Sequence, residues 1–149
     1  MEKEERKPLA EHFEHGADVG IRGWGATAEE AFAGAAAAVS RLWASDPASV
    51  RSEAEAEVGC EAADLEHLLV AFLDELIYLF AIRRFLFAYL AVRIEAPPGA
   101  PLRLTAQGAG ERFDARRHES TVEPKGATLT ALRVARVEGR WVAQCVVDV

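Results

Sequence analysis

The sequence has few cysteines and no long apolar run. Its two cysteines, Cys60 and Cys145, lie far apart without C-x-x-C spacing, so neither a disulfide framework nor a zinc knuckle is indicated. We expect both to be small buried side chains. No window approaches the roughly 18 uncharged apolar residues that a membrane-spanning helix needs, and residues 1–10 are charged where a secretory signal has an apolar core. We therefore expect a soluble, cytoplasmic protein that does not contact membranes.

The chain also lacks the excess of positive charge that binding to duplex nucleic acid requires. It has 17 Lys and Arg residues against 24 Asp and Glu, a formal net charge of -7, so it does not neutralise phosphates in bulk. The acidic excess lies in residues 1–82, whereas residues 83–149 have a basic excess. Two interpretations of the second half stay open: a mixed solvated surface, or a local basic face built from Arg83, Arg84, Arg112, Arg116, Arg117 and Lys125.

Two stretches have the periodicity and the caps of helices. Residues 28–43 are rich in strong helix formers, and Thr27 can cap them with Glu30 as its capping-box partner. Apolar residues recur at helical spacing through residues 65–80, and Asp64 can cap the start of that stretch. We predict a helix in each place and expect the second to be buried.

Short alternating or β-branched runs predict strands in most of the remaining chain. Residues 51–58 alternate small apolar and charged side chains, which fits a half-buried strand. Residues 85–96 and 101–108 have strand patterns on either side of a Pro-Pro-Gly break. Residues 127–137 and 140–149 flank a Glu-Gly turn, which predicts a hairpin.

These elements predict the fold class. A chain of 149 residues is the usual size of one domain. About six antiparallel strands packed with two main helices predict a single compact α+β domain over residues 1–149. We expect residues 1–10 to form a flexible, charged N-terminal segment.

Two acidic residues lie in apolar surroundings at opposite ends of the chain. Asp18 falls at the end or turn of the first predicted strand, and Asp148 ends the last one. If these strands are neighbours, the two carboxylates converge, and Val149 adds a terminal carboxylate and a main-chain oxygen. Oxygen donors of this kind suit Ca²⁺, Mg²⁺ or Mn²⁺ rather than zinc. On spacing alone, turn capping and a surface salt bridge explain the two acids better.

Two histidines near the N-terminus are a weaker metal candidate. His12 and His15 are three residues apart, which places them on opposite faces of a strand. We interpret both as packing or surface residues.

Five segments of the sequence are more specific when taken together. They are HGADVGIRGWGATAEEAFAGAA, DLEHLLVAFLDELIYLF, GERFDARRHE, PKGAT and the final WVAQCVVDV. In this order they cover nearly the whole chain, and together they resemble the archease family. The resemblance implies an α+β fold and a role as the activating partner of the GTP-dependent RNA ligase. That ligase joins 3′-phosphate or 2′,3′-cyclic phosphate ends to 5′-hydroxyl RNA ends in tRNA splicing and RNA repair. Archeases promote guanylylation and multiple turnover of the ligase and are not ligases themselves.

The resemblance also implies which residues act. The acidic metal site of the family falls on Asp18 and Asp148, with Val149 adding main-chain or terminal oxygen, and its important lysine falls on Lys125. The metal would be a divalent cation with oxygen ligands, namely Ca²⁺, Mg²⁺ or Mn²⁺. RNA would be contacted only through the ligase.

Two further residues match the family, and two depart from it. Glu75 and His118 fall on family positions, although helix solvation and a satisfied surface histidine explain them about as well. Leu129 and Thr130 stand where the family usually has tyrosine and histidine, so any role of that histidine is in doubt here.

Two other functions compete with that of a ligase activator. A chaperone-like interaction module would need a large exposed apolar patch, whereas the apolar residues here are periodic enough to form a core. A metal-dependent hydrolase would need a paired nucleophile and base, and no motif supplies one. We expect a non-enzymatic accessory protein.

Overall fold

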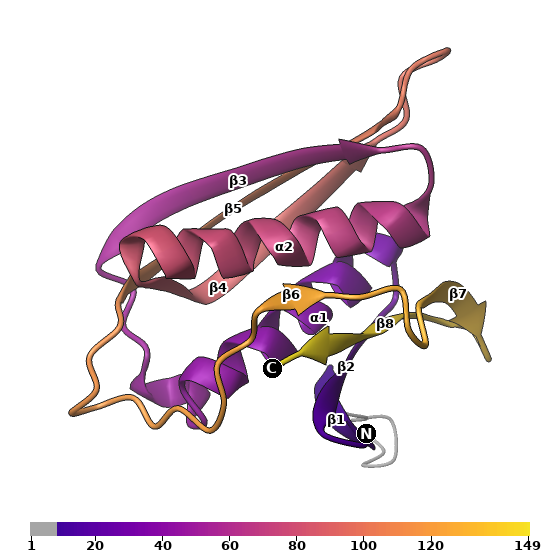
Figure 1. Cartoon of the computed structure of the whole chain (residues 1–149). Helices are drawn as coiled ribbons and strands as arrows, with labels where there is room; N and C mark the ends of the chain where they lie inside the picture. The colour runs from indigo at the N-terminus through magenta and orange to yellow at the C-terminus, as the bar shows by residue number, and fades with distance from the viewer. Residues whose placement is uncertain (1–8) are drawn as a thin grey trace, which may run out of the picture.

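Two antiparallel sheets enclose two helices (Figure 1), and the predicted α+β fold is confirmed. Figure 1 is a computed structural model that describes residues 9–149. The five-stranded sheet has the order β1-β2-β8-β6, with β7 also paired to β8, and the three-stranded sheet has the order β3-β5-β4. The elements are β1 (Ala10–His15), β2 (Asp18–Gly25), α1 (Ala28–Trp43), a short 3₁₀ helix (Pro47–Ser49), β3 (Ala54–Ala62), α2 (Leu65–Arg83), β4 (Phe85–Glu95), β5 (Leu102–Arg112), β6 (Gly126–Ala127), β7 (Arg133–Val137) and β8 (Arg140–Asp148).

Both helices begin at the predicted caps. Glu30 N–H donates to the Thr27 hydroxyl at 3.1 Å, and the Glu30 carboxylate accepts from Ala26 N–H at 2.8 Å. The second bond lies one residue earlier than the capping-box pattern predicts. At α2, His67 N–H donates to Asp64 Oδ1 at 2.8 Å.

The predicted strands are present, but the structure has more strands than predicted. The strand predicted to carry Asp18 is one arm of a hairpin, because β1 precedes it across a turn in which Gly16 has φ of +62°. The predicted strand 127–137 is divided into β6 and β7, and Ala131 between them has φ of +54°. β3 begins three residues later than predicted, because the N–H of Arg51 donates to the side-chain carboxylate of Glu111 rather than to a main-chain oxygen of β5.

The core lies where the helices meet the sheets. Phe72 and Leu73 of α2 are fully buried, as are Phe32 of α1 and Ile21 of β2. Cys145 is also fully buried, and burial raises the pKa of its thiol to about 12. Cys60 is only half-buried, so the expectation of two buried cysteines holds for Cys145 alone.

The first eight residues lie outside the described part of the chain. The predicted flexible segment 1–10 therefore stays a prediction up to residue 8, and Ala10 already begins β1. No helix within residues 9–149 has the length and apolarity needed to cross a membrane.

Helix α1 packs on β2 by backbone contact. A Cβ atom placed on Gly23 would lie 2.1 Å from the carbonyl oxygen of Ala31 and 2.2 Å from the amide nitrogen of Ala35. Both atoms belong to the α1 backbone, so they cannot move aside as a flexible side chain would. The distance between helix and sheet is therefore set by the absence of a side chain at this position.

We expect Gly23→Ala to lower the free energy of unfolding by about 1–3 kcal/mol or more, the usual cost of forcing extra atoms into a packed interior. Urea denaturation followed by circular dichroism measures it. Gly59→Ala is the matched control, because its added Cβ would come no closer than 3.3 Å to the carbonyl oxygen of Leu104. Equal stability of the two variants would contradict the backbone contact.

Candidate functional site

The ends of β2 and β8 lie side by side in the five-stranded sheet. The two strands are antiparallel, and Val19 pairs with Val147. Asp18, which begins β2, and Asp148, which ends β8, therefore lie opposite each other at the next position of the ladder. The main-chain N–H of Val149 donates a hydrogen bond to Asp18 Oδ1 at 3.4 Å. The condition for the two acids to converge, that their strands are neighbours, is therefore met.

A third strand brings Lys125 to the same end of the sheet. β6 pairs with the end of β8, where Gly126 lies opposite Asp148. The N–H of Lys125 donates to the main-chain oxygen of Asp148 at 2.7 Å. The Lys125 side chain is exposed, and within the described part of the chain it forms no ion pair. Lys125 is thus attached through its main chain to the strand end that carries Asp148, and its side chain is exposed to solvent.

The donor atoms at this strand end suit a hard divalent cation. Asp18 and Asp148 offer carboxylate oxygens and Val149 offers a main-chain oxygen, the donors that Ca²⁺, Mg²⁺ and Mn²⁺ prefer. Asp18 is half-buried and Asp148 is exposed, and no basic side chain among residues 9–149 forms an ion pair with either. Within the same range no three side chains of His, Cys, Asp or Glu gather as a metal site. The protein would therefore supply two carboxylates and main-chain oxygen, and water would complete the shell.

The two N-terminal histidines have different positions. His12 Nε2 lies 2.7 Å from the main-chain oxygen of Ala38, so this ring joins β1 to α1. His15 is exposed at the end of β1, and its Cα lies opposite that of Asp18. The interpretation of both as packing or surface residues is confirmed, although His15 lies closer to the acids than its spacing suggested.

Two adjacent acids of α2, Asp74 and Glu75, have different surroundings. Asp74 Oδ1 accepts a hydrogen bond from the N–H of Ala127 at 2.8 Å, which attaches β6 to α2. Glu75 lies toward β3: burial raises the pKa of the Cys60 thiol to about 11, and the charge of Glu75 adds to that rise. The structure thus brings Asp74 to β6, the strand that follows Lys125, whereas Glu75, which falls on the family position, lies beside it in α2 and forms no hydrogen bond with that strand within the described part of the chain. The sequence pattern could not separate them, because both lie beside the polar flank of the helix.

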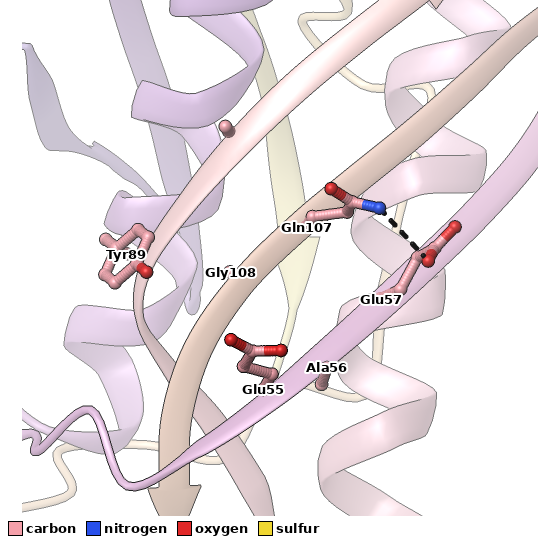
Figure 2. Close-up of a pocket in the computed structure, with 7 residues that line it drawn as sticks. Glu55, Ala56, Glu57, Tyr89, Gln107 and Gly108 are labelled. Carbon is pink, nitrogen blue, oxygen red and sulfur yellow. Dashed lines mark hydrogen bonds between the residues drawn. The ribbon is translucent and has the colours of Figure 1, made fainter.

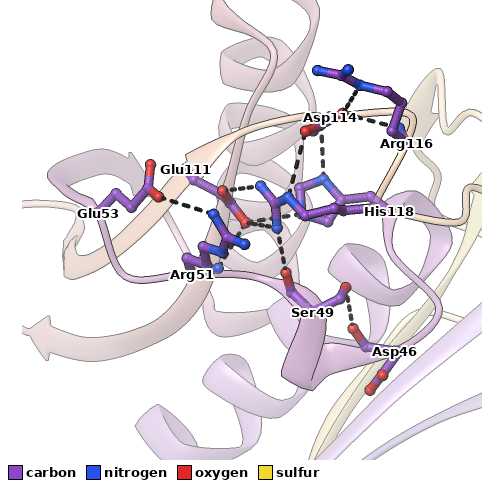
Figure 3. A network of polar contacts seen from close by, with 9 residues as sticks. Asp46, Ser49, Arg51, Glu53, Glu111, Asp114, Arg116 and His118 are labelled. Atoms are coloured by element: carbon purple, nitrogen blue, oxygen red, sulfur yellow. Dashed lines mark hydrogen bonds and ion pairs between the residues drawn. The ribbon is translucent and has the colours of Figure 1, made fainter.

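His118 is buried, which corrects its interpretation as a surface histidine. Only 3% of it is exposed. Its Nδ1 accepts a hydrogen bond from the N–H of Asp114 at 2.9 Å, so the ring proton lies on Nε2. Nε2 then donates to Glu111 Oε2, which is 2.9 Å away. His118 and Glu111 are therefore the buried members of the polar network drawn in Figure 3, and His118 supports the loop after β5.

Glu111 lies at the centre of this network. Burial would raise the pKa of its carboxyl, but hydrogen bonds from the Arg117 guanidinium, the Arg51 N–H and His118 outweigh burial and lower the pKa to about 2. The Arg51 bond is 2.7 Å long. Arg117 also donates to the main-chain oxygen of Ser49 at 2.9 Å. One buried carboxylate thus joins β5, the loop after it and the segment before β3.

The chain between this network and Lys125 is held at further points. Thr121 N–H donates to the main-chain oxygen of Leu42 at 3.0 Å. Glu123 forms an ion pair of 3.5 Å with Arg84, the residue that caps the C-terminal end of α2. Because these contacts attach the loop to both helices, Lys125 enters β6 from a fixed direction.

The same contacts decide between the two interpretations of the basic residues. Arg84, Arg116 and Arg117 form ion pairs with Glu123, Asp114 and Glu111 respectively. Half of the proposed basic face is therefore neutralised locally. The mixed surface is the better description.

Comparison with known proteins identifies the family. The model of the Archease protein family matches residues 11–149. This chain belongs to the archease family. The archease of Pyrococcus furiosus is 39% identical over 140 residues, which cover 93% of this chain and 97% of that relative. The archease of Thermococcus gammatolerans is 40% identical over 139 residues, which cover 93% and 96%.

Solved structures agree with this assignment. The solution structure of Methanobacterium thermoautotrophicum protein 1598 is 25% identical, has a TM-score of 0.78 and is matched over 96% of this chain and 100% of its own. The crystal structure of an archease and possible chaperone from Thermotoga maritima is 20% identical, with a TM-score of 0.55 over 97% of both chains. The second likeness shows the archease fold alone.

The departure from the usual archease motif lies between β6 and β7. Leu129 is 62% exposed. The main-chain oxygen of Thr130 accepts from Val146 N–H at 3.0 Å, and Thr130 N–H donates to the Thr128 hydroxyl at 3.2 Å. The backbone at Leu129 and Thr130 is therefore attached to β8 through main-chain contacts.

We expect Glu111→Gln to lower the free energy of unfolding at neutral pH. The variant's free energy of unfolding should also change less between neutral and acid pH than that of the wild type. A carboxyl with a folded pKa of about 2, against an ordinary 4.5, stabilises the fold above pH 4.5, and that stabilisation disappears as the pH falls toward 2. Its acid-dependent contribution is on the order of 3 kcal/mol.

Urea denaturation at several pH values between 2 and 7 measures this effect. Glu61→Gln is the control, because Glu61 is an exposed carboxylate on β3. The Glu111→Gln curve should be flatter than those of the wild type and the control in the acid range. Three parallel curves would show that the fold does not lower the pKa of Glu111.

Proposed function

We propose that this protein activates a GTP-dependent RNA ligase that joins 3′-phosphate or 2′,3′-cyclic phosphate ends to 5′-hydroxyl RNA ends in tRNA splicing and RNA repair. It promotes guanylylation of the ligase and its multiple turnover, and it is not a ligase itself. The observation that supports this proposal is the convergence of Asp18, Asp148 and Lys125 at one strand end in a member of the archease family.

The residues of the site divide by charge. The carboxylates of Asp18 and Asp148, with the main-chain oxygen of Val149, would bind Ca²⁺, Mg²⁺ or Mn²⁺. A cation bound there supplies positive charge to the phosphates of the nucleotide on the ligase. Lys125 stabilises negative charge that develops on those phosphates as GMP is transferred. The main-chain bond of 2.7 Å between Lys125 and Asp148 keeps the ammonium-bearing residue next to the carboxylates.

RNA is contacted only through the ligase in this proposal. The net charge of -7 opposes a polyanion, and half of the clustered arginines are already paired. The partner that the site requires is a protein that carries a nucleotide, in the cytoplasm where RNA is processed.

A chaperone-like interaction module is the second candidate, because the Thermotoga maritima relative is described as a possible chaperone. Holding unfolded clients requires a large contiguous apolar patch. The large apolar side chains exposed within residues 9–149 lie on several separate elements; they are Leu9, Tyr78, Ile82, Tyr89 and Leu129. This distribution favours the ligase activator.

We expect Asp18→Asn and Asp148→Asn each to remove stabilisation by divalent cations while the fold persists. Removing one of two carboxylate ligands weakens a hard-cation site severely, and a cation that binds only the folded state raises the melting temperature. Thermal melts with and without Ca²⁺ or Mn²⁺ measure the shift. Glu138→Gln, in the turn between β7 and β8, is the control and should respond as the wild type does. Equal shifts in all four proteins would refute the site.

Single-turnover guanylylation of the cognate ligase tests the proposed function and the role of Lys125 together. Substoichiometric wild-type protein should accelerate the reaction with GTP and metal. Lys125→Ala should slow the activated reaction by roughly a hundredfold, the usual scale for a charge-stabilising group, with its melting temperature unchanged. Lys125→Arg should restore only part of the activity, because a planar guanidinium does not replace a compact ammonium.

The control for this assay is Arg133→Ala, which removes an exposed positive charge on β7. It should activate as the wild type does. No acceleration by the wild-type protein would refute the ligase activator, whereas full activity of Lys125→Ala would remove only the assigned role of that lysine.

A further inference from the structure

The three-stranded sheet has one face that no described element covers. Its inner face packs against α2 and α1, while the outer face is open to solvent (Figure 1). A hollow of about 520 Å³ lies in that outer face, and Figure 2 shows the side chains around it. The hollow is lined by Glu55, Ala56, Glu57, Tyr89, Ala91, Gln107 and Gly108.

The shape of the hollow follows from the strand register. Glu55 of β3 lies opposite Ala109 of β5, and Ala109 lies opposite Tyr89 of β4. Only a methyl group therefore stands between the carboxylate and the aromatic ring in this row. Neighbouring strands are about 4.8 Å apart, so the outer two backbones of the row are roughly 10 Å apart. That spacing leaves room for a planar side chain between Glu55 and Tyr89.

An irregularity in β4 brings β4 and β5 close together beside the hollow. The pairing of β4 with β5 shifts between Phe87 and Tyr89, which is a β-bulge. The strands come so close there that a Cβ on Gly108 would lie 2.0 Å from the carbonyl oxygen of Tyr89. The bulge thus requires glycine at this point, and backbone forms this part of the wall.

The charges around the hollow are not balanced. Other acids of the sheet and of the segment before it are paired: Glu53 with Arg51, Glu61 with Arg103 and Glu95 with Arg93. Glu57 accepts only a neutral hydrogen bond, from Gln107 Nε2 at 3.3 Å. Glu55 has no ion pair among the residues that the structure describes. Tyr89, on the opposite side of the hollow, is 60% exposed.

We propose that this hollow is a docking site for an arginine side chain on a basic segment of a partner protein. A guanidinium between Glu55 and Tyr89 would donate hydrogen bonds to the carboxylate and lie over the ring, which uses both walls at once. Glu57 adds a second negative charge at the entrance. A metal ion fits less well, because Glu55 and Glu57 both lie on β3 and, with Tyr89 of β4, do not surround an ion with oxygen ligands. The proposal does not depend on ligase activation, since the hollow is on the other sheet from Asp18 and Asp148.

A short arginine peptide tests the proposal on the intact protein. The probe is acetyl-Gly-Arg-Gly-Arg-Gly-amide, and its control has citrulline at both arginines, which keeps the shape and removes the charge. We expect the arginine peptide to shift the backbone NMR signals of residues 55–57, 89–91 and 107–108. The citrulline peptide should not shift them. Shifts spread over the whole surface, or equal shifts with both peptides, would overturn the proposal.

Variants distinguish binding of the arginine peptide in the hollow from non-specific attraction of a cationic peptide to an acidic protein. Glu55→Gln should weaken binding roughly tenfold, as loss of a charge-assisted hydrogen bond does, and Tyr89→Leu should weaken it roughly threefold. Glu14→Gln is the matched control, because it removes an exposed charge on β1 of the other sheet. Its affinity should equal that of the wild type. A control as weak as Glu55→Gln would contradict a specific site, and unchanged melting temperatures would confirm that every variant is folded.

Discussion

Strand β8 is the element on which the rest of the site depends, because it is hydrogen-bonded along both edges. β2 pairs with one edge, and β6 and β7 share the other. Val146 and Val147 are almost fully buried, so the register of β8 is set by which of its side chains enter the core. A slip of one residue would exchange the two faces of β8 and move Asp148 away from Asp18. The position of the acids is therefore a consequence of core packing.

The short strand β6 shows how the fold holds a functional residue in place without a long ladder. It has only two residues, too few to fix its own position. Asp74 of α2 binds its N–H at Ala127, and the main-chain oxygen of Asp148 binds the N–H of Lys125. On the other side, the buried carboxylate of Glu111 anchors the loop that leads into it. Helix, sheet and loop each contribute one attachment.

Much of this architecture could be predicted from sequence, and the failures have physical causes. Both helices could be predicted because their caps and their apolar periodicity are local signals; they span residues 28–43 and 65–83. The acids Asp18 and Asp148 could be placed together once their strands were taken as neighbours. Contacts between residues far apart in the sequence could not be predicted in this way. Asp74 and Glu75 are adjacent acids in the same helix, and no local feature shows which of them contacts β6. The burial of His118 likewise depends on Glu111, which lies on another element.

The central claim is that Asp18 and Asp148 form one site with one role. Activation of ligase guanylylation by the two single Asn variants and by the double variant tests this claim most directly. Residues that act as a unit have non-additive effects, so the double variant should be no worse than the more damaged single variant. If the two losses multiply instead, the acids act independently, and their meeting at the end of β2 and β8 is not the basis of activation.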